Sequence, residues 1–367
     1  MSFYDTYLEY ENFDTEGFLK EVKEPDVLGI IKKNKLNHHD FLALLSPAAA
    51  NCLEEMAQRA QELSLQHFGK TVLLYTPLYL SNYCVNRCAY CSYNIDHDIK
   101  RKKLTYDEIE KEAQIIAETG LKHILLLTGE SRIETPVSYL VEAVKIMKKY
   151  FDSIAIEIDP LEKEDYQRLI EAGVDGLTIY QEVYDEEVYK QVHLAGPKRN
   201  YHFRLDAPER ACEANIHNVN IGALLGLNKW QHEAFMTGMH ANYLQNKYND
   251  VELSISLPRI RPHVGGFRDV YPVTDQDLVQ VLLAFRIYLP YVAITMSTRE
   301  RGSLRDHLIP LGVTKMSAGV TTEVGGHSDS DKGDSQFEIS DTRSVEEMRK
   351  AILNKGYQPI FKNWMAI

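Results

Sequence analysis

Three of the five cysteines in this 367-residue chain lie on one short stretch. Cys84, Cys88 and Cys91 are spaced C-x3-C-x2-C, and they follow an apolar run, Val72 to Leu80, that predicts a strand. Three thiolates on one loop can ligate a single soft metal centre, and a cubane iron–sulfur cluster normally takes four. The open fourth position is informative, because an iron without a protein ligand can bind a small molecule, as the open position of a catalytic zinc does.

A structural zinc site is the main alternative for these cysteines. His97 lies close behind Cys91 and can complete a Cys3His tetrahedron. A disulfide pair with a spare thiol is a second alternative, and the lack of a secretory-signal pattern from Met1 onward argues against it. Cys52 and Cys212 stand alone, and we expect them to be buried thiols without a ligand role.

The composition narrows the class of protein. There are 41 basic and 53 acidic residues, a net charge of −12, and no basic run beyond Lys100 to Lys103. This balance argues against a nucleic-acid partner. No apolar stretch approaches the length of a membrane span. We therefore expect a cytoplasmic protein with a full-sized core that binds neither nucleic acid nor membrane.

A regular alternation of strand and helix patterns begins at Thr71 and continues to about residue 320. The β-rich runs lie at 71–79, 123–128, 153–158, 176–181, 218–223, 252–257, 292–297 and 313–318. Helical patterns separate them, and the first has clear end signals, with Thr105 as N-cap, Glu108 three residues later and Gly120 just past the end. Eight strands alternating with helices predict an α/β fold with a parallel sheet, and eight is the number that closes a TIM-type (βα)8 barrel.

The two ends of the chain have different patterns, so we expect three units. Residues 1–70 carry helical patterns and predict an N-terminal helical extension. Residues 71–320 form the barrel. Residues 321–367 are predicted to be a C-terminal loop and helix that close on the barrel as a lid and tail.

The C-terminal unit leaves two interpretations open. Thr321–Gln336 is rich in Gly, Ser and Asp, which is typical either of a disordered linker or of a segment folded across the barrel mouth. The strand-like Gln336-Phe337-Glu338 favours the second interpretation. A final helix is expected at Val345–Asn354, and Trp364 is expected to anchor the tail on the domain.

The distinctive residues of the barrel all lie at the ends of the predicted strands. In a (βα)8 barrel the active site gathers at the carboxyl ends of the strands. The cysteine loop follows the first strand, and the later strand ends carry Thr128-Gly129-Glu130, Glu157 and Asp159, Gln181-Glu182, Gly222, Pro258-Arg259, Ser297-Thr298-Arg299 and Ser317 to Gly319. This coincidence predicts one site on one rim.

These residues carry a family resemblance. C-x3-C-x-Tyr-C directly after a strand resembles the cluster loop of radical S-adenosylmethionine (SAM) enzymes. The wider chain is similar to one branch of them, the anaerobic tyrosine lyase that makes 2-iminoacetate (dehydroglycine) for the thiazole of thiamine. The matching words are Pro77-Leu78-Tyr79-Leu80-Ser81-Asn82, Lys100-Arg101-Lys102, Leu127-Thr128-Gly129-Glu130-Ser131, Tyr180-Gln181-Glu182, Ile221 to Leu227, Ser256-Leu257-Pro258-Arg259, Ser297-Thr298-Arg299-Glu300, Gln336-Phe337-Glu338 and Asp341-Thr342-Arg343-Ser344.

The resemblance implies a [4Fe–4S] cluster on the three cysteines, with one iron free to bind SAM. It assigns Gly129 and Glu130 to the SAM amino group, where the alternative is an ordinary turn at a strand end. Glu157 is placed to hold the ribose hydroxyls, and Arg204 to pair with the SAM carboxylate; for both the alternative is an ordinary ion pair. The remaining expected SAM contacts are Tyr90 and Leu225.

The substrate is expected to carry a carboxylate, because two arginines lie on the late strand ends. Arg299 is the first candidate for a bidentate clamp and Arg259 the second, unless Glu300 or Asp269 already holds them. Candidates for contacts to the amino group are Ser317, Ser297, Tyr180 and Gln181.

The reaction implied by the resemblance is a radical lysis of L-tyrosine. One electron into the cluster cleaves SAM, and the resulting 5′-deoxyadenosyl radical removes hydrogen from the tyrosine amino group. The Cα–Cβ bond then breaks to give 2-iminoacetate and 4-cresol. A one-electron donor such as flavodoxin or ferredoxin and a thiazole synthase that receives the product are the implied partners.

Three other functions are alternatives to this one. The maturase that uses tyrosine for iron hydrogenase needs a second, C-terminal cysteine cluster, and no cysteine follows Cys212 in this sequence. A tryptophan-cleaving relative stays open, since Ser92-Tyr93 stands where many relatives have Gly-Phe. A zinc-stabilised scaffold without catalysis is the alternative from a different class.

Overall fold

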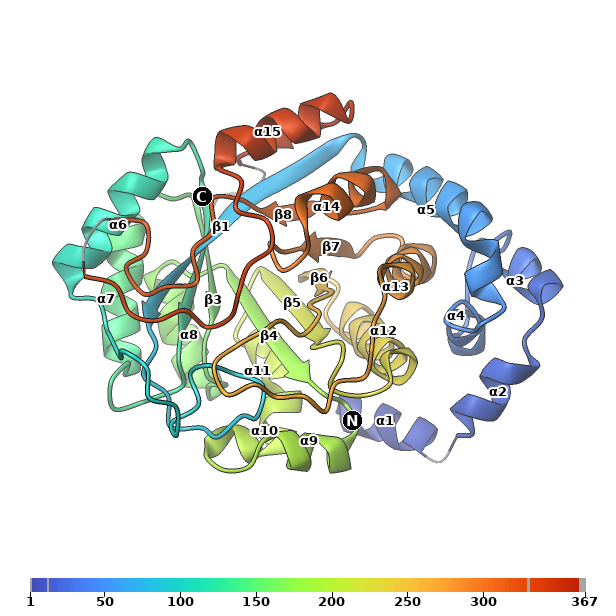
Figure 1. Ribbon diagram of the computed structural model, residues 1–367, viewed down its shortest axis with the longest axis horizontal. Helices are drawn as coiled ribbons and strands as arrows, with labels where there is room; N and C mark the ends of the chain where they lie inside the picture. Colours follow the sequence, from blue (N-terminus) through green and yellow to red (C-terminus); the bar gives the residue numbers. More distant parts are fainter. Residues whose placement is uncertain (1, 12, 329–330, 363–367) are drawn as a thin grey trace.

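Eight parallel strands form a closed barrel in this computed structural model, which describes residues 2–11, 13–328 and 331–362. The strands are β1 (Thr71–Ser81), β2 (His123–Thr128), β3 (Ser153–Glu157), β4 (Gly176–Glu182), β5 (Asn218–Ala223), β6 (Glu252–Ser256), β7 (Ala293–Met296) and β8 (Lys315–Ser317). They pair in sequence order, and β2 and β8 both pair with β1, so the sheet closes on itself (Figure 1). The predicted (βα)8 fold is confirmed, and each predicted strand lies within two residues of its observed bounds.

Helices connect the strands and cover the outside of the barrel. They are α6 (Tyr106–Glu118), α7 (Val137–Met147), α8 (Lys163–Ala172), α9 (Glu186–Val192), α10 (Tyr201–Leu205), α11 (Ala207–Glu213), α12 (Trp230–Lys247), α13 (Asp275–Tyr288) and α14 (Gly302–Leu308). At the start of α6 the Glu108 N–H donates to Thr105 Oγ1 (3.3 Å) and the Thr105 N–H donates to the Glu108 carboxylate (2.8 Å), which satisfies two backbone donors. Within the described ranges, the helices include none with the length and apolar character of a membrane span.

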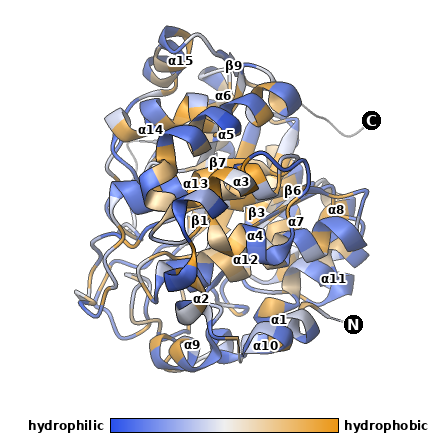
Figure 2. Ribbon diagram, turned by 90° about the vertical axis from the view of Figure 1, so that its right-hand side faces the viewer, coloured by the Kyte–Doolittle hydropathy of each residue, from blue (hydrophilic) through white to orange (hydrophobic). Residues whose placement is uncertain are grey.

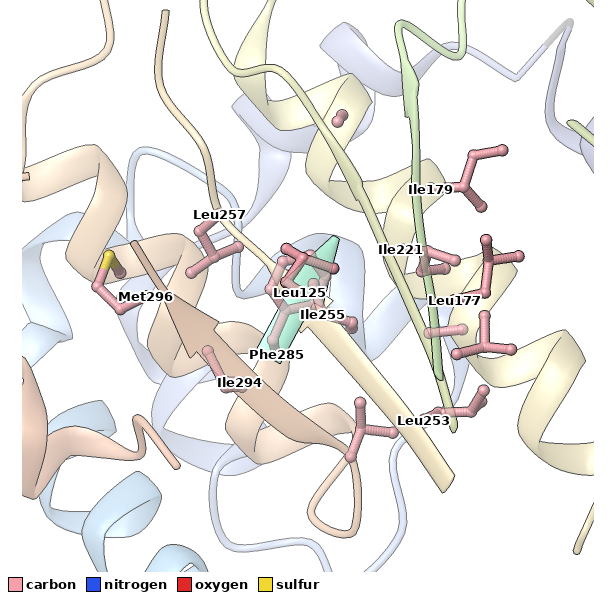
Figure 3. Close-up of a cluster of buried hydrophobic side chains, with 14 of the residues drawn as sticks. Leu125, Leu177, Ile179, Ile221, Leu253, Ile255, Leu257, Phe285, Ile294 and Met296 are labelled. Carbon is pink, nitrogen blue, oxygen red and sulfur yellow. The ribbon is translucent and has the colours of Figure 1, made fainter. Parts of the chain in front are cut away.

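Large apolar side chains alternate with small or polar ones along most of the later strands, such as β3, β6 and β7, whereas β1 and β2 are nearly continuous apolar runs. The apolar ones are buried between the sheet and the surrounding helices, where they meet Phe285 of α13 (Figure 3). They include Leu177, Ile179, Ile221, Leu253, Ile255, Ile294 and Met296. Intervening residues such as Thr178 of β4 and Thr295 of β7 line a common hollow on the barrel axis. Because side chains on a strand alternate between faces, this pattern leaves a polar barrel interior.

The residues before β1 form a helical extension on one side of the barrel. Its elements are α1 (Phe3–Glu11), α2 (Thr15–Glu21), α3 (Glu24–Ile30), α4 (His38–Ala43), a 3-10 turn (Ala49–Cys52) and α5 (Leu53–Phe68). The extension packs on α12 and α13, with the rings of Phe41 and Tyr288 stacked at 4.3 Å (Figures 1 and 2). Figure 2 shows its helices in front of the largely orange strands. The division of the chain at residues 70 and 320 stays a prediction.

The segment after Gly319 crosses the carboxyl ends of the strands (Figure 1). Its contacts there include a hydrogen bond from Tyr93 OH to Thr322 O (3.1 Å). The expected strand character of 336–338 was wrong: Gln336 and Phe337 form bends. Two backbone bonds, from Gln336 N to Thr322 O and from Glu338 N to Pro262 O, tie this segment to loops rather than to a strand edge. The predicted final helix is present as α15 (Val345–Asn354), and Trp364 lies outside the described residues.

An additional strand, β9 (Gln358–Ile360), was not foreseen. It pairs in parallel with the first three residues of β1, and β2 pairs with β1 from Thr76 onward. Leu73 pairs with both β8 and β9, so β9 continues the edge of β1 that β2 leaves free. A three-residue strand close to the end of the chain gives too short an alternation to be distinguished from a loop.

Candidate active site

The three cysteines line one hollow of about 70 Å³ at the carboxyl end of the barrel. The loop that carries them is fixed from behind by the Lys100-Arg101-Lys102 segment. The Asn82 side-chain amide donates to Lys100 O (2.9 Å) and accepts from the Lys102 N–H (2.7 Å). The Arg101 guanidinium donates to the carbonyl oxygens of Tyr93 (2.9 Å) and Asn94 (2.6 Å). These bonds satisfy the loop's backbone and hold its shape.

A second set of contacts fixes the same loop from the side of β4. The Lys198 N–H donates to Asn86 Oδ1 (2.9 Å), and the Asn86 amide donates to the Glu130 carboxylate (2.7 Å). The phenol of Tyr90 is hydrogen-bonded to His193 Nε2 (2.7 Å). The cysteine loop is therefore bound to the elements that follow β2 and β4, which places the sulfur atoms against the rim.

The donor set suits a cluster better than the zinc alternative. The His97 ring does not line the hollow; its Nδ1 lies 3.1 Å from Ser92 O, and the ring packs on the Cα of Gly265. In the described part of the chain, no group of three His, Cys, Asp or Glu side chains is arranged to hold a single metal ion. Three cysteine thiols facing one hollow are the donors that a four-iron cluster with one open iron requires.

Burial controls the protonation of these thiols. It raises the pKa of Cys84 and Cys88 and takes that of Cys91 to about 11. Without a metal the three side chains are therefore neutral thiols at physiological pH, and coordination would release their protons. Cys52 and Cys212 are buried free thiols in the helical layer, as predicted.

Gly129 lets the cysteine loop approach the end of β2. A β-carbon at this position would lie 2.3 Å from Tyr83 O, and the Gly129 N–H donates to Ser81 O (2.8 Å). The family resemblance implies that this glycine lies in close contact with SAM. The structure adds a reason within the chain itself, because any side chain at 129 would push the cysteine loop off the strand.

We expect Gly129→Ala to lose cluster binding, because two backbone segments would have to separate. Overpacking of this kind costs about 1–3 kcal/mol of folding free energy, and here the strain falls on the ligand loop. Iron and sulfide content per chain, measured with the melting temperature, tests this. Gly29→Ala is the matched control: a β-carbon there meets nothing within 4 Å, in the helix α3. Full cluster occupancy in Gly129→Ala would contradict the prediction.

Four charged side chains form a network beside the cysteines. Glu130 accepts from Arg204 (3.1 Å), and Glu182 accepts from Lys198 (2.8 Å). Burial alone would raise the pKa of Glu182, but Lys198 and Arg204 hold it below its usual value. Glu182 has a φ of 69°, a strained backbone for a residue with a side chain. Arg204 is therefore already paired with carboxylates, which is the alternative that the sequence analysis left open.

Glu157 differs from this network because no arginine or lysine pairs with it in the described residues. Its carboxyl group, at the end of β3, lines both this hollow and an adjoining one of about 50 Å³. Burial, and then the charge of Glu182, raise the pKa of Glu157 to about 7. The group therefore changes charge within the physiological range and is free to accept hydrogen bonds from a ligand.

The adjoining hollow contains the first-choice arginine. The Arg299 guanidinium lies 3.5 Å from the centre of the Phe337 ring, a cation–π contact, and no carboxylate of the described chain forms an ion pair with it. Arg259, by contrast, is bonded to Asp275 (2.9 Å) and Glu300. The alternative of an arginine held by Glu300 therefore applies to Arg259, while Arg299 keeps its charge for a ligand.

The other predicted contacts divide between the hollow and the layers around it. Tyr90 and Tyr180 line the second hollow. Leu225 does not, since its backbone pairs with Pro258 and Ile260 and the preceding Leu224 takes the lining position. The buried Gln181 amide also lies outside the lining, with both polar atoms unbonded.

Ser317 belongs to the barrel interior rather than to the hollows. Its hydroxyl accepts from the Thr298 N–H (3.1 Å), so it fixes the strand end that precedes Arg299. Ser297 accepts from the Arg299 N–H (3.4 Å). The roles of these residues toward a substrate stay predictions.

Several lining residues had no role in the sequence analysis. They are Tyr79, Tyr93, Lys198, Arg261, Gln336 and Phe337. Gln336 joins the C-terminal segment to the site, since its amide accepts from Tyr79 OH (2.9 Å) and approaches Cys91 Sγ (3.9 Å). Gln336 and Phe337 stood in a recognised word of the sequence, but Lys198 and Arg261 lie on loops whose course no periodicity predicts.

Comparisons with known proteins agree on one family. The chain matches the model of the radical SAM superfamily over residues 78–237 and that of the biotin and thiamin synthesis associated domain over residues 256–358. It is 39% identical to the 2-iminoacetate synthase of Salmonella typhimurium over 92% of this chain and 90% of that protein. It is 38% identical to the 2-iminoacetate synthase of Escherichia coli over the same shares.

A solved structure supports the same grouping. The X-ray structure of the FeFe-hydrogenase maturase HydG from Carboxydothermus hydrogenoformans superposes with a TM-score of 0.89. The identity is 33%, over 95% of this chain and 83% of that one.

Proposed function

Since the chain belongs to the radical SAM superfamily and, within it, to the 2-iminoacetate synthase family, we propose that it cleaves the Cα–Cβ bond of L-tyrosine to give 2-iminoacetate and 4-cresol. One structural observation supports this activity at the site described above. The three cysteines and Arg299, which has no ion-pair partner in the described chain, line two adjoining hollows. The lining residues that the two hollows share are Cys91, Glu157, Glu182, Lys198 and Gln336. A cluster with its cofactor and a carboxylate-bearing substrate can therefore meet at one mouth.

The chain's own residues divide the work between them. When bound, the [4Fe–4S] cluster and SAM supply a 5′-deoxyadenosyl radical after one-electron reduction. Cys84, Cys88 and Cys91 hold the cluster, and Glu130 and Glu157 accept hydrogen bonds from SAM. Arg299 binds the tyrosine carboxylate and turns the amino group toward the radical, because a near-attack geometry matters more here than acid–base strength.

The C-terminal segment excludes water from this chemistry. Gln336 bridges Tyr79 and Cys91, and Tyr93 holds Thr322. The phenols of Tyr79 and Tyr93 are buried, and burial raises the pKa of both well above its usual value, so they stay neutral donors. A closed mouth of this kind protects a radical from side reactions.

SAM binding should depend on pH through Glu157. Ribose hydroxyls donate to the ionised carboxylate, so the charged form is the binding form. Because its pKa is raised to about 7, SAM affinity should rise with pH through that value, by ~tenfold between pH 6 and pH 8. Equilibrium binding of SAM to the unreduced holoenzyme measures this, and Glu157→Gln should flatten the profile. An unchanged profile in that variant would assign the pH dependence to SAM itself.

Product identification tests the activity directly. The anaerobic holoenzyme is incubated with SAM, a reductant and each aromatic amino acid separately. Formation of 4-cresol and of glyoxylate, the hydrolysis product of the imine, from tyrosine alone supports the proposal. An indole product from tryptophan would instead establish the tryptophan-cleaving alternative, and a colourless protein with stoichiometric zinc would establish the scaffold.

Two protein partners follow from this function. The cluster needs a one-electron donor such as flavodoxin or ferredoxin. The imine hydrolyses readily in water, so we propose that a thiazole synthase accepts it at the barrel mouth when the C-terminal segment opens. Mixing the two proteins should give a higher thiazole yield than keeping them in compartments that only small molecules can cross. Equal yields would contradict direct transfer of the imine.

A further inference from the structure

A second cavity, of about 360 Å³, lies at the end of the barrel opposite the cysteines. Each of the eight strands contributes its first residue to the lining, from Thr71 of β1 to Lys315 of β8. The cysteine loop follows the last residue of β1, so the two sites lie at opposite ends of a parallel barrel. The volume falls in the range of about 300–1,000 Å³ that is usual for small-molecule sites. We call this space the floor cavity.

The floor cavity exists because the lower barrel interior carries small and polar side chains. TIM-type barrels normally fill this space with bulky branched residues. Here Ala155, Ser254 and Ala293 line it. Bulky residues of β6 and β7, Ile255, Ile294 and Met296, belong instead to the buried cluster of Figure 3. The space is therefore a consequence of the strand alternation described above.

Lys315 gives the floor cavity its charge. Its Nζ lies 5.0 Å from the centre of the Tyr75 ring, and within the described ranges no oxygen accepts a hydrogen bond from it. The two carboxylates of the lining, Asp175 and Glu252, form no ion pair with it. Asp175 accepts instead from the Ser153 hydroxyl (3.0 Å). Lys315 is half-buried, and an ammonium that lines a cavity without a hydrogen-bond acceptor from the chain offers its charge to an anion.

The neighbouring groups are neutral donors. Burial lowers the pKa of His123 to about 3, so that imidazole is uncharged, and His217 lies near Glu252 at the rim. Asn218 and Ser254 line the cavity with side chains whose hydrogen atoms are not donated to any described residue. Burial also lowers the pKa of Lys315, which the charges of Asp175 and Glu252 oppose.

We propose that the floor cavity binds a small monocarboxylate, with the carboxylate on Lys315 and within reach of Asn218 and Ser254. Burial raises the pKa of Asp175 to about 7, so its carboxyl group can stay neutral, and Glu252 is exposed at the rim beside His217. The single charge of Lys315 can then neutralise a monocarboxylate but not the two charges of a phosphate. The apolar part of the lining, which includes Leu73, Leu253 and Ile360, can cover a short hydrocarbon body. This inference does not depend on the tyrosine lyase function.

Isotope-labelled propionate is a suitable probe. It is titrated into the holoenzyme with both SAM and L-tyrosine present and no reductant, so that the cluster and the Arg299 hollow at the other end of the barrel are occupied. One site per chain is expected. Lys315→Met, which keeps the length of the side chain, should weaken binding at least tenfold, while the exposed Lys145→Met should leave it unchanged. Equal affinity in Lys315→Met, or no binding to the wild type, would overturn the proposal.

Two further measurements keep the proposal testable. Inorganic phosphate should bind more weakly than propionate, and equal binding would overturn the monocarboxylate assignment. Ala293→Leu fills the floor cavity without changing its charge and should abolish propionate binding. If Lys315→Met fails to fold, Ala293→Leu decides: retained propionate affinity in that variant would place the ligand elsewhere.

Discussion

Replacing any one of Cys84, Cys88 and Cys91 by alanine should abolish SAM cleavage. Each variant leaves two thiols for a cluster that needs at least three protein ligands when SAM takes the fourth iron. Loss of 5′-deoxyadenosine formation should be complete, because no chemistry starts without the electron that the cluster delivers. The measurement is 5′-deoxyadenosine per chain after anaerobic reconstitution, together with iron content.

Cys212→Ala is the matched control for this series. Cys212 is a buried free thiol on α11, away from the mouth, and its loss should cost stability without reducing iron content. If all three cysteine variants still cleave SAM, these cysteines do not hold the cluster. Cleavage lost in Cys212→Ala as well, at normal iron content, would mean that the assay reports folding rather than ligation.

Arg299→Lys should uncouple the two halves of the reaction. SAM would still be cleaved, but little cresol would form, because an ammonium keeps the charge and loses the fork that fixes the direction of the carboxylate. Losing a charge-assisted bidentate pair in a dry site costs roughly 2–4 kcal/mol of substrate binding, on the order of a hundredfold in affinity. The measurement is the ratio of 4-cresol to 5′-deoxyadenosine.

Arg259→Lys provides the comparison, since that arginine is committed to Asp275 and Glu300. The Arg259→Lys variant should have a lower melting temperature and the wild-type ratio of 4-cresol to 5′-deoxyadenosine. If Arg299→Lys also keeps the wild-type ratio, Arg299 does not bind the carboxylate. Arg261 then becomes the candidate, because it lines the same hollow with an unbonded, buried Nε.

The barrel could be predicted because its signals are local and repeated. Each strand is a short apolar or alternating run, and the capping box of Thr105 and Glu108 marks a helix start by itself. The cysteine spacing is equally local. These features depend on residues that are close together in the sequence, and a single sequence shows such local patterns directly.

The parts of the site that could not be predicted from the sequence depend on contacts between segments that are distant along the chain. Lys198 reaches the cysteine loop through a hydrogen bond from its backbone N–H to Asn86 Oδ1, and Gln336 approaches Cys91 from 245 positions later in the sequence. The pairing of Arg259 with Asp275, rather than with Asp269 as considered, depends on the course of a loop. No rule based on residue spacing predicts contacts of this kind. The sequence therefore identified individual charged residues but not the ion pairs between them.

The pairing of β1 has a consequence for how the protein is made. This strand joins β8 and β9, which lie at the other end of the sequence, and it carries the cysteine loop at its own end. During synthesis β1 leaves the ribosome early, and β2 can pair with one of its edges soon afterwards, but the other edge stays uncovered until β8 has been made. Contacts between such distant segments slow folding. The ligand loop should therefore become ordered late, so that cluster insertion follows completion of the chain.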